Sequence, residues 1–91
     1  MSHVSSSDVR AYILSHLTEE LRLQGRALPD DLPDDYDLLL SGLIDSLGLL
    51  ELMTALGEFC GREIDFESVD PDEMTILGPL SRFVAEEATQ A

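Results

Sequence analysis

Ser46 carries the hydroxyl group whose position in the sequence could do chemistry. It follows Asp45 and precedes Leu47, where a segment rich in proline and aspartate gives way to the helical pattern "SLGLLELMTALGEFC" of residues 46–60. A serine or aspartate at such a junction can simply cap the helix by accepting a hydrogen bond from a first-turn N–H group. Alternatively, a serine exposed at a helix start is a point where another group can be attached. These residues alone leave both interpretations open.

Five aspartates between residues 30 and 37 raise the question of a metal site. They are Asp30, Asp31, Asp34, Asp35 and Asp37. A calcium-binding EF-hand loop needs oxygen ligands at alternating positions, a central glycine and a terminal glutamate. The segment has none of that spacing, so the sequence predicts a solvated acidic loop and no metal site.

Two other side chains, His16 and Cys60, belong to types that take part in catalysis. His16 falls near the edge of a predicted helix face and has no matched nucleophile, so a Ser-His-acid hydrolase is not expected. Cys60 falls on an expected core face, with Arg62 as the one cation nearby, which favours a buried structural cysteine over a reactive thiol. The sequence therefore predicts no catalytic residue, and we do not expect an enzyme.

The charge of the chain is strongly negative. Nineteen acidic residues face five arginines and no lysine, and the formal net charge is −14. Nucleic-acid binding requires clustered cations, and an anionic membrane surface would repel this chain as well. We therefore expect neither nucleic acid nor membrane as a partner. Enzymes with basic docking patches are the expected partners, because the acidic field would attract and orient them.

The length, the cysteine count and the apolar runs of the sequence further limit the class of protein. A length of 91 residues suits one domain. The single cysteine excludes an intramolecular disulfide and any zinc site built on cysteines. The N-terminal sequence "MSHVSSSDVR" lacks the apolar segment of a secretory signal, and the longest apolar runs are far shorter than a membrane span. We expect a soluble, cytoplasmic monomer.

Apolar spacing predicts three substantial helices. The first follows Ser6 or Ser7, either of which can cap it, and ends before Gly25. The second is expected at residues 46–60. The third is the stretch "TILGPLSRFVAEEA", with Thr75 as its expected cap.

A short fourth helix is expected in "VDPDEM". Asp70 can cap it, Pro71 suits its first position, and Glu73 completes the capping pattern. The connection at residues 26–44 is predicted to be a long ordered loop because its leucines must be buried, and loops this long are often functional. No run alternates as a strand does. The expected fold class is all-α, a small four-helix bundle of three main helices and one short helix with a long first loop.

The predicted helix at residues 46–60 has two different faces at about 100° per residue. Its core face is expected to hold Leu49, Leu52, Met53, Leu56, Phe59 and Cys60. Its opposite face carries Leu47, Leu50, Glu51, Thr54 and Glu58. Two leucines ringed by acids beside Ser46 predict a docking surface for a partner, although the preceding loop could instead cover Leu47. Gly48, a poor helix residue, is expected to leave space beside Ser46.

The stretch "SGLIDSLGLLELM" resembles the phosphopantetheine attachment region of acyl and peptidyl carrier proteins. The triplet Asp45-Ser46-Leu47 matches the central motif of that family. The likeness extends from about residue 7 to residue 86, through the order of the helices, the long loop and the "T-I-x-x-L" opening of the last helix. One position departs from the family, since Cys60 stands where a large apolar residue is usual.

The resemblance implies that 4′-phosphopantetheine is esterified to the hydroxyl group of Ser46 by a separate phosphopantetheinyl transferase, with coenzyme A as the donor. Cargo would then travel as a thioester on the thiol of this arm. The resemblance also implies Asp45 and Leu47 as the adjacent motif residues. The implied partner surface consists of Leu47, Leu50, Glu51, Thr54 and Glu58. Further implied partners are a loading ligase or acyltransferase and a downstream synthase or tailoring enzyme.

The expected organisation is a flexible arm at residues 1–6, a carrier domain at residues 7–87 and a flexible end at residues 88–91. No catalytic domain or linker flanks the carrier domain in this sequence, so we expect a stand-alone carrier. The form "GLIDSLGLLEL" resembles discrete carriers of specialised-metabolite pathways, and D-alanyl carriers, more than carriers of the fatty-acid type, and we expect a polyketide or nonribosomal peptide pathway. The alternative from another class is an acidic helical protein-interaction module without a prosthetic group.

Overall fold

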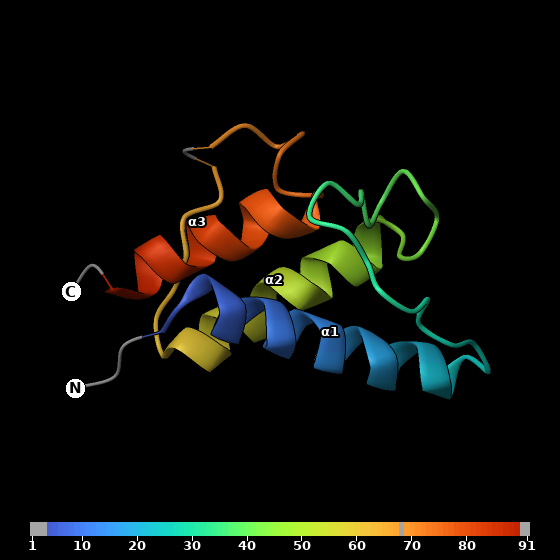
Figure 1. Cartoon of the computed structure of the whole chain (residues 1–91). Helices are drawn as coiled ribbons and strands as arrows, with labels where there is room; N and C mark the ends of the chain where they lie inside the picture. Colours follow the sequence, from blue (N-terminus) through green and yellow to red (C-terminus); the bar gives the residue numbers. More distant parts are fainter. Residues whose placement is uncertain (1–3, 68, 90–91) are drawn as a thin grey trace.

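The computed structural model describes residues 4–67 and 69–89, and its regular secondary structure is helical (Figure 1). No strand occurs in these two ranges, where one isolated bridge pairs Asp37 with Ile76. The predicted all-α class is therefore confirmed. The helices are α1 (Ser6–Leu23), α2 (Ser46–Cys60) and α3 (Leu77–Thr89). Among the described residues, no helix combines the length and the apolarity needed to cross a membrane.

The start of α1 is fixed by Ser5, and the prediction that Ser6 or Ser7 caps this helix is wrong. The hydroxyl group of Ser5 accepts a hydrogen bond from the N–H group of Asp8 at 3.2 Å. The Asp8 carboxylate accepts one in return from the N–H group of Ser5, also at 3.2 Å. This reciprocal pair satisfies two N–H groups that a helix start leaves unbonded. Gly25, with φ of 72°, turns the chain after the helix as expected.

The predicted flexible ends are only partly described. Residues 1–3 and 90–91 lie outside the described residues. Val4 already packs against the core, and α3 continues through residue 89.

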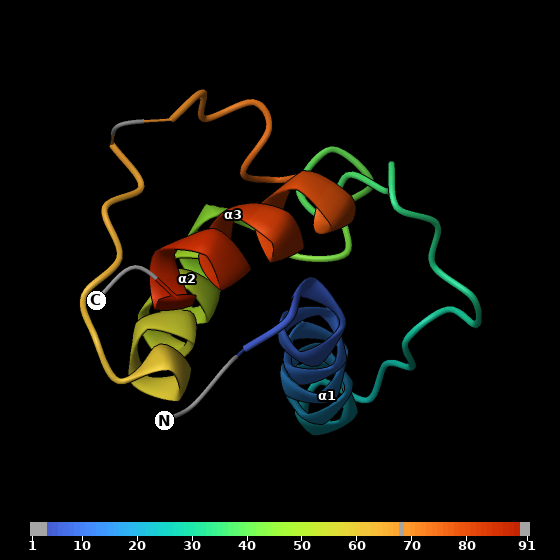
Figure 2. The same ribbon diagram turned by 60° about the vertical axis from the view of Figure 1, so that its left-hand side comes forward.

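The core lies where α1 faces the other two helices. Figure 2, which looks nearly along α1, shows α2 and α3 together on one side of it. The apolar residues that recur every fourth position of α1 are buried, as their spacing predicts. They are Val9, Ile13, Leu17 and Leu21. The other helices contribute Leu52, Leu56, Leu77, Leu80 and Val84, and the connection before α2 contributes Leu32, Leu38 and Leu43. The connection is thus part of the core.

Residues 71–75 form consecutive turns, and the predicted short helix is absent from the described structure. The N–H groups of Glu73 and Ile76 donate to carbonyl groups only three residues earlier, at 3.0 and 3.1 Å. An α-helix requires bonds that span four residues. The Asp70 side chain accepts a bond from the N–H group of Asp72 at 3.0 Å. Such local side-chain bonds compete with helix formation.

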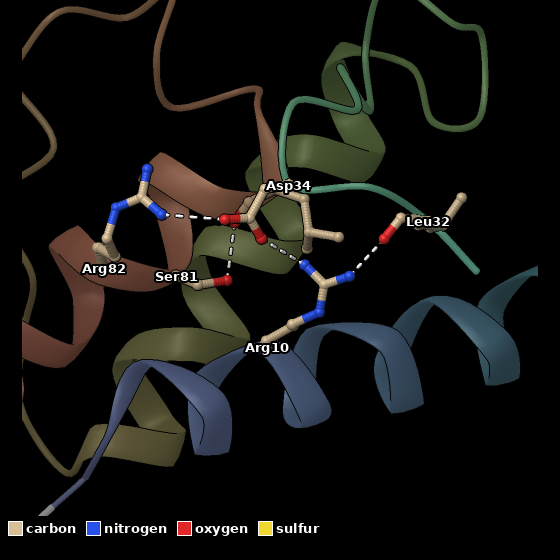
Figure 3. A network of polar contacts seen from close by, with 6 residues as sticks. Arg10, Leu32, Asp34, Ser81 and Arg82 are labelled. Carbon is tan, nitrogen blue, oxygen red and sulfur yellow. Dashed lines mark hydrogen bonds and ion pairs between the residues drawn. The ribbon is translucent and has the colours of Figure 1, made fainter.

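Asp34 holds the connection between α1 and α2 against helices α1 and α3 (Figure 3). Its carboxylate pairs with Arg10 of α1 at 2.9 Å and with Arg82 of α3 at 3.1 Å. Arg10 also donates to the carbonyl oxygen of Leu32. The Asp34 carboxylate is largely exposed, so each ion pair contributes little to stability. Together, however, the contacts fix where the connection crosses the helices.

Gly78 allows the close approach of Asp34 to α3. Its N–H group donates to the carbonyl oxygen of Asp34 at 2.7 Å. A β-carbon added at Gly78 would lie 2.9 Å from both the carbonyl oxygen and the carboxyl carbon of Asp34. Since one of these atoms belongs to the backbone, no side-chain rotation relieves the clash. Glycine is therefore required here for the connection to pack on α3.

Asp37 forms a second tie between the connection and the start of α3. Its carboxylate accepts hydrogen bonds from the N–H groups of Leu39 and Leu40 at 3.0 and 2.9 Å and from the hydroxyl group of Thr75 at 3.0 Å. Its backbone pairs with that of Ile76. The Thr75 hydroxyl is used in this tie, so the prediction that Thr75 caps α3 is wrong. These bonds shape the turn that leads toward Ser46.

We expect replacement of Asp37 by asparagine to weaken the fold at neutral pH and to remove part of its acid sensitivity. The bond from Leu40 lowers the pKa of Asp37 most, and the bonds from Thr75 and Leu39 lower it further against the opposing effect of burial. A carboxylate with a lowered pKa stabilises the fold above its ordinary pKa of about 3.9 and loses this contribution as the pH falls further. The expected loss at neutral pH is about 1–3 kcal/mol.

Denaturant unfolding between neutral and acidic pH measures this effect. The difference between the wild type and Asp37→Asn should shrink as the pH falls below about 4. Asp35→Asn removes one exposed carboxylate from the same segment and is the matched control. A difference that stayed constant with pH, or that was equally large for Asp35→Asn, would contradict the role given to Asp37.

Candidate functional site

Ser46 is the first residue of α2, and its side chain is exposed. Asp45 precedes it as the N-cap, with its carboxylate accepting a hydrogen bond from the N–H group of Gly48 at 2.7 Å. Within the described residues, no hydrogen bond engages the hydroxyl group of Ser46. The two interpretations of the sequence are thereby separated: Asp45 caps the helix, and the Ser46 hydroxyl remains accessible for chemistry.

The sequence predicts that Gly48 leaves open space beside Ser46, but in the structure this glycine is closely surrounded. A β-carbon at Gly48 would lie 3.2 Å from the β-carbon of Ile44 and 3.3 Å from the Asp45 carboxylate. These contacts are tighter than ordinary van der Waals distances, so the neighbouring groups would have to shift. Glycine therefore lets Ile44 and the capping carboxylate pack closely against the first turn of α2.

The outward face of α2 carries the side chains predicted for it. Leu47 is 64% exposed and Leu50 is 61% exposed, so the preceding loop does not cover Leu47. Glu51, Thr54 and Glu58 are exposed as well. Five residues on one helix therefore form an accessible surface that combines two large apolar side chains with two carboxylates. That this surface binds a partner stays a prediction.

The core face of α2 is narrower than predicted. Leu52 and Leu56 are fully buried, whereas Leu49 and Met53 are only half-buried. Phe59, predicted to lie in the core, is 40% exposed. Its ring stacks on that of Tyr12 with centroids 4.3 Å apart. Phe59 therefore packs against a single aromatic ring of α1 at the edge of the core and keeps part of its surface exposed.

A groove of about 660 Å³ opens directly beside Ser46. Its volume falls within the range of sites that hold small molecules and cofactors. α1 contributes His16 and Glu20 to its wall, which continues through Gln24 at the C-cap of this helix and Arg26 of the connection. Leu17, Leu21, Leu39, Leu43 and Ile44 supply its apolar lining, and residues 45–48 and Glu51 line it from the α2 side. The groove thus joins three separate parts of the chain at the candidate attachment point.

Sequence reasoning missed the part of this site that α1 supplies. His16, Glu20 and Gln24 are spaced four residues apart, as are Leu17 and Leu21 next to them. A polar stripe running beside an apolar stripe on one helix marks a boundary between core and surface. The spacing therefore held a signal, but it did not indicate which other segment would face that boundary.

Leu40 is a second missed residue. Its side chain is 86% exposed in the connection that precedes α2, although the sequence predicts that leucines of this segment are buried. Its N–H group donates to Asp37, which fixes the backbone in a turn that points the side chain outward. Leu40 is thus a large apolar side chain that the connection exposes to solvent.

The structure gives no chemical role to the other reactive side chains considered from the sequence. Cys60 is half-buried, and burial raises the pKa of its thiol group while the charge of Arg62 opposes this shift. His16 is half-buried with its ring 6.4 Å from that of Tyr12. In the part of the chain that the structure describes, no three side chains of the metal-binding types gather as a metal site would require.

Comparison with known proteins adds no relative. No protein-family model matches the chain, and neither the curated proteins nor the solved structures include a match. Any function must therefore be argued from the motif around Ser46 and from the geometry described above.

Proposed function

We propose that this protein is a carrier protein that bears 4′-phosphopantetheine on Ser46. The observation that carries the proposal is the exposed, unbonded hydroxyl group of Ser46 at the start of α2, inside an Asp-Ser-Leu triplet. Exposed Leu47 and Leu50 lie on the same helix and offer a surface to the enzymes that would modify or use the carrier. The protein itself would catalyse no reaction.

The residues around Ser46 fit such a group. The phosphodiester formed on the Ser46 oxygen would be anionic, and the N–H groups of a helix start favour an anion. The Asp45 carboxylate would repel this anion because both are negative. The role proposed for Asp45 is therefore to cap α2 and to be recognised by partners. The groove provides room beside the attachment point for the rest of the arm. When bound, the group supplies a terminal thiol on which cargo is held as a thioester.

The finer description follows from the resemblance of the motif and from charge. The proposed partners are a phosphopantetheinyl transferase, a loading ligase or acyltransferase, and a synthase or tailoring enzyme with a basic patch. The proposed setting is a polyketide or nonribosomal peptide pathway in the cytoplasm, with the carrier acting as a monomer. The net charge of −14 supports basic partners.

The decisive experiment is to incubate the purified protein with coenzyme A and a broad-specificity phosphopantetheinyl transferase. Intact mass spectrometry should show an increase equal to one phosphopantetheine group, and peptide mapping should place it on Ser46. A well-known carrier protein serves as the positive control for the transferase. An unchanged mass under conditions that modify the control would reject the proposal and leave an interaction module without a prosthetic group.

We expect association with the transferase to slow as salt is added. The Debye length falls from about 30 Å at 0.01 M ionic strength to about 3 Å at 1 M. Electrostatic steering accounts for roughly tenfold or more of the association rate in strongly charged pairs. Stopped-flow or surface-based kinetics across this range should therefore show a decrease of about that size.

The charge on the outward face of α2 can be tested within the same experiment. Glu51→Gln removes a carboxylate beside the leucine pair, while Glu63→Gln removes an exposed carboxylate beyond the end of α2. We expect the first change to slow association more than the second. An association rate that was independent of salt, or equally affected by both changes, would count against docking through this face.

A further inference from the structure

We propose that the groove beside Ser46 binds the pantetheine arm, folded back against α1. Ser46 itself lines the groove, so an arm attached to its hydroxyl group begins at the groove edge. The wall supplied by α1 and its C-cap includes His16, Glu20 and Gln24, which lie 22 to 30 residues before Ser46 in the sequence. This inference rests on the proposed function and assigns the arm a resting place on the carrier.

The chemistry of the groove matches that of the arm. Pantetheine combines two amide groups with short apolar segments, one of which carries two methyl groups. Leu39 and Ile44, which are only half-buried, and the exposed Leu47 line the groove and offer apolar surface to those segments. Gln24 and His16 offer hydrogen-bond donors and acceptors to the amide groups. Small-molecule sites typically combine an apolar lining with a few polar groups that fix orientation.

Arg26 keeps the groove formed before any arm is attached. Its guanidinium group donates to the carbonyl oxygen of Gly42 at 3.3 Å and to that of Leu43 at 3.4 Å. These bonds tie the segment just after α1 to the segment just before α2. A site formed in advance binds its occupant without a further cost of ordering the protein. The groove is therefore prepared to receive an arm from Ser46.

Nuclear magnetic resonance of the protein before and after modification tests the inference. Resonances near Ser46 will change on attachment in any case and are not used. We expect additional chemical-shift changes at His16, Glu20 and Gln24, and nuclear Overhauser contacts between the arm's methyl groups and the half-buried Leu39. Changes confined to the immediate neighbours of Ser46 would overturn the inference.

A matched pair of variants separates a filled groove from a general effect. Glu20→Trp places a large side chain in the groove wall, whereas Glu19→Trp places it on the adjacent position of α1 that does not line the groove. Both changes remove one carboxylate. We expect the attachment-dependent shifts at His16 and Gln24 to be lost in Glu20→Trp and retained in Glu19→Trp. Equal retention in two folded variants would overturn the inference.

Failure of the proposed function can be distinguished from failure of this inference. If Ser46 accepts no arm, the function fails, and the groove is then tested by titrating free pantetheine into the unmodified protein. Saturable shifts at His16, Glu20 and Gln24 would support the groove as a pantetheine site, and their absence would overturn it. If Ser46 is modified but these resonances do not move, the function stands and the groove assignment is wrong.

Discussion

Replacing Ser46 by alanine is expected to abolish attachment of phosphopantetheine completely while leaving the fold intact. The loss should be total because no other atom at this position can form the phosphate ester. Stability should be unaffected or slightly raised, since Asp45 and not Ser46 caps the helix and alanine favours helix by up to about 0.7 kcal/mol over ordinary residues. The carrier proposal thus predicts that this change abolishes the attachment of phosphopantetheine and leaves the stability of the fold almost unchanged.

Intact mass spectrometry after incubation with coenzyme A and transferase measures the first effect, and thermal unfolding measures the second. Ser15→Ala removes an exposed serine from α1 and is the matched control, which should be modified as fully as the wild type. Modification of the Ser46→Ala protein, at any residue, would refute Ser46 as the attachment site. A large loss of stability would show that Ser46 has a structural role.

The second large effect concerns two leucines on opposite faces of α2. Leu56→Ala is expected to lower the free energy of unfolding by about 2–5 kcal/mol, because Leu56 is fully buried between the helices. Leu50→Ala is expected to change it by no more than about 0.5 kcal/mol, because Leu50 is largely exposed. In modification and loading assays, Leu50→Ala should be the more impaired of the two at a temperature where both are folded.

Denaturant unfolding of both variants, beside the rate of their modification, separates core from surface. Each variant serves as the control for the other, since the chemical change is the same and only the face of the helix differs. Should Leu50→Ala unfold more easily than Leu56→Ala, the orientation of α2 would be wrong. Should Leu50→Ala be modified at the normal rate, the docking surface would have to lie elsewhere.

What could be predicted from the sequence was set by local interactions. The bounds of α2 and the exposure of Leu47 and Leu50 follow from residues within a single helix, whose geometry repeats regularly. Ser46 could be singled out because its neighbours in the chain already mark a helix start. The uncertain point was which of two adjacent residues caps the helix, and that depended on the orientation of the Asp45 carboxylate.

Much of what could not be predicted depended on contacts between segments distant in sequence. The groove exists because one stripe of α1 meets the residues just before α2, and helical spacing does not report such a meeting. The hydroxyl group of Thr75 donates a hydrogen bond to Asp37, which lies 38 residues earlier, and does not cap α3. Phe59 stacks on Tyr12 of α1, a contact between distant segments that helical spacing does not specify.

Two other differences were local. Ser5 caps α1 through its bonds with Asp8. The Asp70 side chain bonds to the N–H group of Asp72 where a short helix was predicted.

The arginines of this protein have a consequence for its behaviour among other macromolecules. Arg10 and Arg82 hold Asp34, Arg22 pairs with Glu19, Arg26 binds two carbonyl groups, and Arg62 donates to the carbonyl group of Glu87 at 2.7 Å. All five are therefore already engaged within the molecule. A second copy approaching in crowded solution meets carboxylates and no guanidinium group that lacks an internal contact. Electrostatics therefore favours an encounter with a protein that offers its own cations over an encounter between two copies of this chain.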